Sequence, residues 1–513
     1  GPMEFEGTSA TFTNGVEGGD NDLTLNFSQA ATVDGYSNVA NFTSEGDVDL
    51  SGNFTTSGFQ KYEGNVALGG NTELVATTVE FADGVTGNLK NLTLSPSDSF
   101  IKLDGIQLSG VENLTIDGDL NLSGNLSAGD IDIQGDTTLI GDANLTSEIV
   151  SCISSREINL DGTVDGAHAL TVNATTTFDG EIGGTTPLAS LTTEGGDTSL
   201  GGNVTTTGNQ NFGSDVTLTG DTKFVSGNLF DLSGLVGGGH NVEIDAASTI
   251  IDAQKHNVSG IADLTVPGDV GLNGSIATTG SQSYGSDVGV LGNTTLTAGS
   301  GAISLGTGGE VIGLSHTLTL GDASQTGDVT LSGDVSLDGL EVGQGVFNLR
   351  VNTSQFTVTK LVDVLSTGTL EINPVGNSQL NFVSGLNATN PSSINLAGAI
   401  ASSQGPGDLV FGYAKVGYAS QNATLTVGGN ENAVISFNTL EINGGKLNYD
   451  GPVDIGDLNI TNANGAADVG LNGTGDLQVS GDASVTGNVS SGGNLSDGGS
   501  QLYDGNVTLT GTA

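Results

Sequence analysis

The chain has very few of the residues that build a compact core or a covalent scaffold. It contains no Trp, one Cys, one Met and 8 Pro among 513 residues. A single cysteine, Cys152, excludes an intrachain disulfide framework. Apolar residues make up 35% of the chain and aromatic residues 5%, less than a globular chain of this length normally uses. The composition therefore favours a thin core of Val, Leu, Ile and Ala over one large core.

Positive charge is also scarce. The sequence has 10 Lys and Arg against 58 Asp and Glu, for a formal net charge of −48. Binding to nucleic acid or to an anionic membrane surface draws on Lys and Arg, so the charge argues against both partners. No apolar run approaches the length of a membrane span, so we predict no direct membrane insertion of this chain. We interpret the acidity as a source of solubility, with divalent cation binding or a saline medium as the alternative.

Glycine is abundant, with 84 residues, and it recurs in a regular pattern. The stretch 118–146 reads GDLNLSGNLSAGDIDIQGDTTLIGDANLT, with a glycine about every six residues. Apolar residues two apart, such as Leu120 and Leu122, lie on one face of a strand. Glycine beside Asp or Asn is typical of tight turns. A short strand followed by a corner, repeated many times, predicts an all-β solenoid rather than a disordered chain or a hairpin ladder.

The short units are grouped into a longer repeat, and each longer repeat contains three of them. Asp47-Val-Asp-Leu50 is followed by the similar Asn65-Val-Ala-Leu68, and pairs with the same spacing begin at Asp197 and Asp269. Between the members of each pair lies a second motif with glutamine and an aromatic residue: Gly58–Tyr62, Gly208–Phe212 and Gly280–Tyr284. The spacing predicts three-sided coils of ~18 residues, hence about 28 coils and a rod on the order of 130 Å.

The regularity of the pattern suggests four segments. Residues 1–5 resemble a cleavage and cloning remnant, and residues 6–344 carry the regular repeats. Residues 345–480 are less regular and hold four of the eight prolines, so they are either further coils with longer loops, which we favour, or an inserted β module. Residues 481–513 return to the repeat and stop within a motif, from which we expect the chain to be a fragment of a longer protein.

The repeats in residues 162–222 resemble those of large bacterial exoproteins of the filamentous-haemagglutinin-like class. The likeness rests on Gly162-Thr-Val-Asp-Gly-Ala-His-Ala-Leu-Thr-Val172, Gly183–Leu191, Gly202–Phe212 and Asp215–Gly220. The resemblance implies a right-handed parallel β-helix in an elongated rod, located outside the cell or at its surface. It also implies secretion through an outer-membrane partner and a role as an adhesin or biofilm-matrix scaffold. The amino-terminal secretion domain of that class is not evident in this sequence.

Parallel β-helices also include polysaccharide lyases and hydrolases, so catalysis has to be considered. Glycoside cleavage needs paired carboxylates, but 58 acidic residues make chance pairs inevitable. The ten basic residues are scattered singly and form no run that resembles a lyase site. We therefore predict no enzyme activity, no catalytic residue and no cofactor, and keep a β-helical lyase or hydrolase as the alternative.

Metal binding is a weaker prediction. His168 and His240 lie in similar motifs, but their spacing in the sequence equals four coils, which places them too far apart to share an ion. Calcium remains open, because acidic residues are densest where the repeat is tightest and stacked corners could offer oxygen ligands. The nonapeptide calcium repeat is absent, so we favour solvated corners. The candidate calcium ligands are Asp117, Asp119, Asp130, Asp132, Asp136 and Asp142.

The recurring aromatic residues are the candidate ligand contacts. Tyr62, Phe212, Tyr284 and Tyr503 occupy one motif position, where they either stack in the core, which we favour, or form an exposed stripe for sugars. The sequence thus predicts a rod-like shaft of an adhesin or matrix protein that contacts a carbohydrate or another cell surface. A passive spacer, with its binding tip outside this chain, is the remaining alternative.

Overall fold

The computed structural model consists of strands and connecting turns, without a helix in the residues that it describes. It describes residues 1–96, 101–104, 106–148, 156–372, 379–403, 407–416, 424–428, 435–443, 446–450, 452–461, 470–473, 477–479, 483–485, 488–491, 495–497, 501–503 and 507–509. The chain divides into two compact units, Gly1–Ser248 (unit 1) and Thr249–Ala513 (unit 2). Each unit is described by itself below.

Most strands are short. Unit 1 contains β1 (Met3–Gly7), β2 (Thr11–Phe12), β3 (Val16–Phe27), β4 (Ala31–Val33), β5 (Tyr36–Ser44), β6 (Val48–Thr56), β7 (Phe59–Tyr62), β8 (Val66–Ala76), β9 (Thr78–Phe81), β10 (Val85–Pro96), β11 (Ile101–Asp104), β12 (Leu108–Ile116), β13 (Leu120–Ala128), β14 (Asp130–Ile133), β15 (Thr137–Ser147), β16 (Glu157–Leu160), β17 (Val164–Asp165), β18 (Ala169–Phe178), β19 (Ser190–Leu200), β20 (Val204–Thr206), β21 (Gln210–Leu218) and β22 (Thr222–Val236). Strand β23 (Val242–Ile261) includes the division between the units.

Unit 2 continues the same kind of strand. It contains β24 (Leu264–Val266), β25 (Val270–Thr278), β26 (Gln282–Tyr284), β27 (Val288–Thr297), β28 (Ile303–Leu305), β29 (Glu310–Leu320), β30 (Val329–Leu331), β31 (Asp334–Val342), β32 (Leu349–Val351), β33 (Phe356–Val358), β34 (Val362–Val364), β35 (Thr369–Ile372), β36 (Gln379–Phe382), β37 (Leu386–Ala388), β38 (Ser393–Leu396), β39 (Gly398–Ala401), β40 (Leu409–Val416), β41 (Thr424–Gly428), β42 (Ile435–Asn443), β43 (Lys446–Asp450), β44 (Val453–Thr461), β45 (Gly470–Gly473), β46 (Leu477–Val479), β47 (Ala483–Val485), β48 (Asn488–Ser491), β49 (Leu495–Asp497), β50 (Gln501–Tyr503) and β51 (Val507–Leu509).

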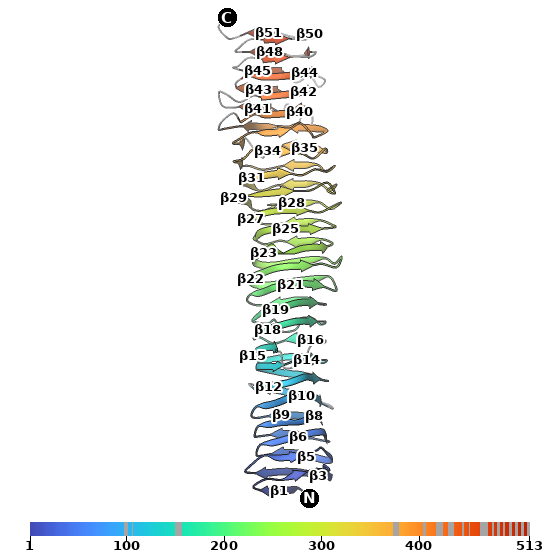
Figure 1. Ribbon diagram of the computed structural model, residues 1–513. Coiled ribbons are helices and arrows are strands. Elements are labelled where there is room, and N and C mark those ends of the chain that lie inside the picture. Colours follow the sequence, from blue (N-terminus) through green and yellow to red (C-terminus); the bar gives the residue numbers. More distant parts are fainter. Residues whose placement is uncertain are drawn as a thin grey trace. The chain divides into compact units, whose positions relative to one another are not determined.

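Within each unit the strands pair in parallel with strands one turn away in the chain (Figure 1). Strand β6, for example, pairs with β8, so that Val48 faces Val66 and Leu50 faces Leu68. Parallel pairing of successive short strands defines a β-solenoid, and the chain winds through about 21 turns. The all-β, parallel-solenoid prediction is therefore confirmed.

The length of a turn varies more than the sequence repeat suggests. Val48 faces Val66 at the predicted spacing, but Thr137 pairs with Val164 and Ile303 with Val329, so these two turns are considerably longer. The estimate of 28 coils is therefore wrong. In the turn from Ile303 to Val329, residues 306–309 and 321–328 lie outside the strands, and the parallel register is kept on both sides of them, so longer turns reduce the number of coils without breaking the ladder.

The register also continues through the less regular part of the sequence. Strand β35 pairs with β32 and β38, and strand β42 pairs with β40 and β44. In the described residues of 345–480, parallel strands thus stack as they do earlier in unit 2. At the other end of the chain, β1 pairs in register with β3, so residues 3–7 take part in the ladder of unit 1.

The core is a column of inward-facing side chains. In β6, Val48 and Leu50 are buried, whereas Asp49 between them faces outward. This alternation repeats from turn to turn, because successive side chains in a strand point to opposite faces. Burial of each Val, Leu or Ile contributes about 1.5–3 kcal/mol, so many small layers replace one large core.

Glycines stack where neighbouring turns come too close for a side chain. A Cβ on Gly135 would lie 2.4 Å from the carbonyl carbon of Gly118, and one on Gly162 would lie 2.5 Å from the carbonyl oxygen of Gly135. Gly180 meets Gly162, and Gly202 meets Gly180, in the same way. These five residues form the glycine column of unit 1. The recurring glycines of the sequence therefore mark close approaches of backbone as well as turns.

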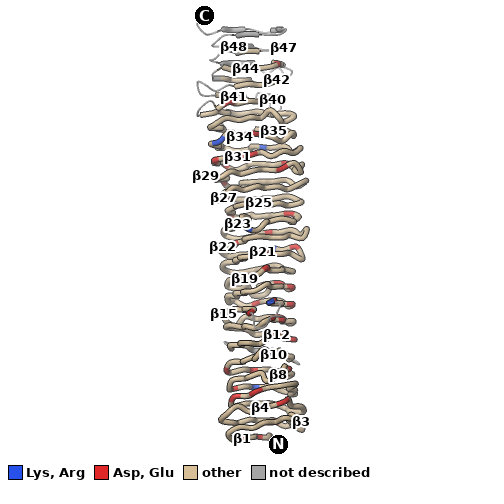
Figure 2. The backbone as a smooth tube through the Cα atoms, in the orientation of Figure 1, with Lys and Arg blue, Asp and Glu red and all other residues tan. Residues whose placement is uncertain are grey.

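Acidic residues recur from turn to turn in both units, while Lys and Arg are few (Figure 2). No helix in the described residues is long and apolar enough to cross a membrane. The polar residues that could bind a ligand or hold turns together occupy three kinds of position: in the core, at the corners, and on the outward face of the strands.

Candidate functional site

The recurring aromatic residues lie in the core rather than on the surface. Tyr62, Phe212 and Tyr284 are fully buried. In unit 1, Tyr62 packs against Phe42 and Phe81, with ring centroids 5.4 and 5.2 Å away. A sugar-stacking stripe made of these three residues is therefore wrong, and the core-stacking interpretation is correct for them. The side chain of Tyr503 lies outside the described residues.

The glutamine of the same motif ties neighbouring turns together. Nε2 of Gln282 donates to the backbone oxygens of Ile276 and Thr297, at 3.2 and 2.8 Å, although Gln282 is buried. Gln60 and Gln210 make equivalent bonds to residues six before and fifteen after them. The sequence showed the motif but not this role, which the fixed glycine–glutamine–aromatic spacing could have suggested.

The aromatic hydroxyl completes the glutamine site in two of its three copies. Oη of Tyr62 donates to Oε1 of Gln60 at 2.9 Å, and Oη of Tyr284 donates to Oε1 of Gln282 at 3.1 Å. Burial raises the pKa of both tyrosines well above the usual value, which keeps them protonated donors. The third copy has Phe212, and Oε1 of Gln210 is buried without a hydrogen bond.

This difference predicts that Phe212→Tyr stabilises the protein. The new hydroxyl would donate to Gln210, which should raise the free energy of unfolding by about 1 kcal/mol, whereas Tyr284→Phe should lower it by about 1 kcal/mol or slightly more. Urea unfolding of both variants beside the parent chain measures the two effects. A loss of stability in Phe212→Tyr would show that the hydroxyl does not fit and would refute this explanation.

At the corners, Asp and Asn side chains accept hydrogen bonds from the backbone of the next turn. Oδ1 of Asp47 accepts from the amide of Asn65 at 2.9 Å, and Oδ1 of Asp136 accepts from the amide of Thr163 at 2.8 Å. Asn203 does the same for Lys223 at 2.9 Å. The amides of Asn65 and Thr163 directly precede strands, and that of Lys223 lies at the start of β22, so the corner residues supply acceptors where the strands begin.

Four of the six candidate calcium ligands have this role. Asp119, Asp130, Asp136 and Asp142 each accept from a backbone amide of the following turn, at 2.7–3.1 Å. Asp117 and Asp132 instead accept from the side chains of Ser95 and Gln134. In the described part of the chain, no group of three or more His, Cys, Asp or Glu is placed to hold a metal ion.

We therefore predict that calcium removal leaves stability unchanged. Dialysis against EDTA should not alter the melting temperature, because the corner carboxylates already bind backbone amides. A scan in buffer with added calcium, compared with one with magnesium at the same ionic strength, controls for charge screening. A melting temperature that falls with EDTA and is restored by calcium but not by magnesium would contradict the prediction.

Two histidines accompany the corner bonds. Nδ1 of His168 lies 3.8 Å from Asp142, and Nδ1 of His240 lies 3.7 Å from Asp221. The residue after each histidine donates its backbone amide to the same aspartate. The two histidines thus share one kind of corner contact, but the register places the strands that follow them on different sides of the solenoid.

Asp221 provides a test of the corner bond through pH. The amide of Asn241 donates to it at 2.8 Å and, with a smaller effect of His240, holds the pKa of the carboxyl below its usual value of 3.8. A lowered pKa in the folded state stabilises the fold above the unfolded pKa, and this stabilisation is lost as pH falls through the folded pKa. The contribution should therefore begin to fall at about pH 4 and be lost completely only below the lowered pKa of the folded state.

Asp221→Asn should remove this pH dependence while keeping the acceptor, since the side-chain oxygen of Asn203 accepts the amide of Lys223 in the same way. The melting temperature of the variant relative to the parent should rise as pH is lowered from 6 to 3. Glu194→Gln, which removes an exposed carboxylate without a corner bond, serves as the matched control. Parallel pH profiles for Asp221→Asn and the parent chain would refute the assignment.

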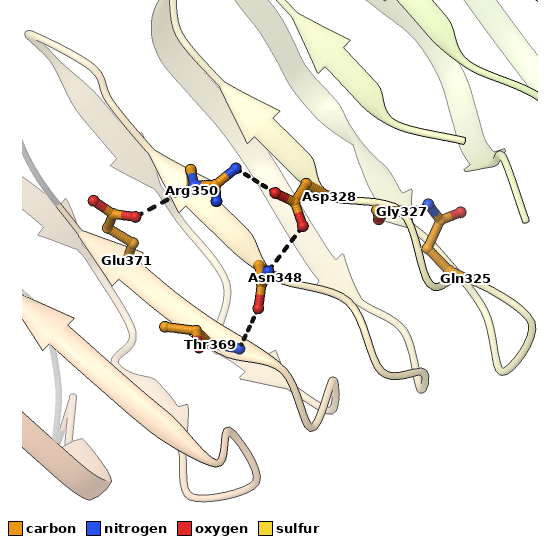
Figure 3. A network of polar contacts seen from close by, with 7 residues as sticks. All are labelled: Gln325, Gly327, Asp328, Asn348, Arg350, Thr369 and Glu371. Carbon is orange, nitrogen blue, oxygen red and sulfur yellow. Dashed lines mark hydrogen bonds and ion pairs between the residues drawn. The ribbon is translucent and has the colours of Figure 1, made fainter. Parts of the chain in front are cut away.

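The basic residues also serve contacts between turns. Arg350 on β32 contacts Asp328 through Nη1, and its Nε lies 3.3 Å from Glu371 on β35 (Figure 3). Asn348 donates to Asp328 at 2.8 Å and accepts from the amide of Thr369 at 2.8 Å. This network holds three successive turns of unit 2 together.

Two further lysines also link neighbouring turns. Lys223 lies 2.7 Å from Glu243 and Lys360 lies 2.8 Å from Asp338, in each case one turn away along the chain. Lys61, in contrast, pairs with Glu63 on its own turn.

The outward positions of the strands form registered polar columns. In unit 1 one column runs through successive turns with a hydroxyl, amide or carboxylate at each step: Thr93, Thr115, Asp132, Asn159, Thr177, Ser199 and Thr217. In unit 2 a similar column contains Ser275, Thr295, Thr319, Glu341, Asp363 and Asn387. Neighbouring strands lie about 4.8 Å apart, so each column offers polar groups at a fixed repeat.

No protein-family model, no curated protein and no solved structure matches the chain. The β-solenoid is compatible with a β-helical repeat protein. The outward face of this solenoid carries the polar columns described above.

Proposed function

We propose that this chain is part of the shaft of a secreted bacterial adhesin or biofilm-matrix protein of the filamentous-haemagglutinin-like class. Its surface would bind polysaccharide or another cell surface through many weak contacts. The observation that carries this proposal is the set of outward polar columns, because a repeated row of hydroxyl and amide groups suits a ligand that is itself a repeating polymer. The resemblance of the repeats adds secretion through an outer-membrane partner.

The distribution of the remaining polar groups supports binding over catalysis. The glutamines and corner residues are engaged in holding turns together, and Lys223, Arg350 and Lys360 are engaged in ion pairs. A lyase or hydrolase would need such groups for proton transfer near a bound sugar. We therefore propose that the chain retains its ligand without cleaving it and uses no cofactor.

Co-sedimentation with a panel of insoluble bacterial, plant and algal polysaccharides tests the proposal. The protein should pellet with at least one polysaccharide, and the supernatant should contain no released sugar. Release of sugar would overturn the proposal in favour of a β-helical lyase or hydrolase. Absence of both retention and release would refute binding and identify the chain as a spacer. A fraction of pelleted protein that increases with the number of solenoid turns in the protein tested would support binding through many weak contacts.

A further inference from the structure

Four successive turns of unit 2 present one registered lattice on their outward face. Strands β25, β27, β29 and β31 pair in parallel, so that Gly271 faces Gly289, Gly289 faces Ile312, and Ile312 faces Ser336. Gly271 and Gly289 have no side chains, so the backbone is the surface at these two positions and lies lower than the side chains around it. Residues two before and two after the column lie on the same outward face, since side chains alternate along a strand.

On two of the four turns, the edge of this lattice two residues after the column is apolar and exposed: Leu291 is 54% and Leu314 is 77% exposed, and Ile312 in the column itself is 38% exposed. The same position holds Asn273 and Asp338 on the other two turns. Leu291 extends over Gly271, where an added Cβ would lie 2.5 Å from its Cδ1. The corresponding motif position holds Ser51 on β6 and Asn273 on β25 but the exposed Ile140 on β15, so a single apolar residue occurs there elsewhere, whereas Leu291 and Leu314 lie on adjacent turns.

The opposite edge is acidic. Asp269, Asp287, Glu310 and Asp334 precede or begin the same four strands, one on each turn. Oδ1 of Asp287 accepts the amide of Glu310 at 2.8 Å, and Oδ1 of Asp269 accepts the hydroxyl of Ser286 at 2.6 Å, which holds the carboxylates in line. None of these four carboxylates has an ion pair within the part of the chain that the structure describes.

A ligand for this apolar–acidic strip must be linear, with positive charge along one side and apolar surface along the other. A second copy of the chain fits poorly, because each carries a net charge of −48. An extended peptide would find no free strand edge to pair with, since β27 and β29 are paired on both sides. A pyranose chain has apolar C–H faces, and amino groups on its rings add positive charge, so it supplies both kinds of surface in one linear ligand.

We propose that the strip formed by Asp269, Asp287, Leu291, Glu310, Ile312 and Leu314 binds a cationic polysaccharide made of amino sugars. Its protonated amines lie against the acidic edge, and the C–H faces of its rings lie on Leu291, Ile312 and Leu314. This inference rests on the proposed polysaccharide-binding function and names its ligand class and its place. Binding at a given pH requires both the amine of the sugar and the carboxylates to be charged.

The test measures binding of the whole chain to a glucosamine hexamer at about pH 5.5, by calorimetry, with the N-acetylglucosamine hexamer for comparison. Replacing both leucines (Leu291→Ser with Leu314→Ser) should weaken binding about tenfold. Replacing two acids (Asp287→Asn with Glu310→Gln) should weaken it by a similar factor and flatten its salt dependence. Ile140→Ser, an exposed apolar residue at the same motif position in unit 1, should change the dissociation constant less than twofold.

Unchanged binding in the leucine variant, or an equal loss in Ile140→Ser, would overturn the strip as the site. Equal affinity for the acetylated hexamer would overturn the role of the amine. Tighter binding of an oligolysine peptide, lost in the same variants, would assign the strip to a basic protein partner instead. If the strip variants still pellet with the insoluble polysaccharides, polysaccharide binding by the chain is supported but the strip is refuted as its site. Failure of the parent chain in both assays would refute both.

Discussion

Gly162→Ala is expected to lower the free energy of unfolding by about 3 kcal/mol, at the upper end of what overpacking costs in a well-packed protein. The added Cβ would lie 2.5 Å from the carbonyl oxygen of Gly135, and that oxygen belongs to backbone that a ladder on either side holds in place. Relief would require two turns to separate, which breaks packing and hydrogen bonds together.

The matched control is Gly213→Ala in the same unit. Its Cβ would meet nothing closer than the backbone oxygen of Thr193 at 3.4 Å, so the substitution should cost little or even stabilise by restricting the unfolded chain. Urea unfolding and hydrogen exchange of both variants provide the comparison. Equal stability of Gly162→Ala and Gly213→Ala would show that neighbouring turns are not packed as closely as the glycine column requires.

The second large effect is expected at Gln282. Replacing it by Met keeps the length of the side chain but removes its donor and acceptor, which takes the donor from the part-buried backbone oxygen of Thr297 and the acceptor from the buried hydroxyl of Tyr284. Each buried unpaired group costs about 1–3 kcal/mol, so we expect a loss of about 3 kcal/mol in the free energy of unfolding. The loss should be concentrated in β25, β26 and β27, because repeat proteins distribute stability between neighbouring turns.

Gln254→Met provides the surface control, since Gln254 is exposed on β23. A double-mutant cycle with Tyr284→Phe separates the hydroxyl bond from the rest of the glutamine site. If Gln282→Met and Gln254→Met cost the same, the buried glutamine is only a space-filling residue and the cross-turn interpretation is wrong.

Much of the fold could be predicted because its signals are local. The alternation in Leu120-Asn-Leu122 places two side chains in the core and one outside, as the structure shows. The spacing of the sequence repeat gave the correct register wherever corners are short, as between Val48 and Val66. It failed between Ile303 and Val329, because the number of residues outside the strands can vary while the strands still pair.

The candidate site was harder to predict because the same residue types serve two purposes. For Asp119 and Asp136 the sequence favours solvated corners, with calcium binding as the alternative, yet each accepts a backbone amide of the next turn. For Tyr62 and Tyr284 it favours the core, with sugar contact as the alternative, and each also completes a buried glutamine. Only the stacking of turns decides whether a recurring polar residue points to its neighbour or to solvent, and that stacking depends on turn length.

The exposed leucines were missed for a related reason. Leu291 and Leu314 are ordinary apolar residues in a sequence that is full of buried Val and Leu, and nothing in their spacing marks them as outward. Their position two residues beyond Gly289 and Ile312 places them on the surface. The acidic edge beside them belongs to the corner pattern, which repeats over the whole chain.

The central claim is that corner residues hold successive turns together and leave the outward columns for contact. The amide of Thr163 tests it most directly, because it lies outside a strand and donates to Oδ1 of Asp136 at 2.8 Å. We predict that residue-resolved hydrogen exchange finds this amide protected in the parent chain and in Asp136→Asn, and exposed in Asp136→Ala. Exchange of Thr163 at the rate of an open loop in the parent chain would contradict the account.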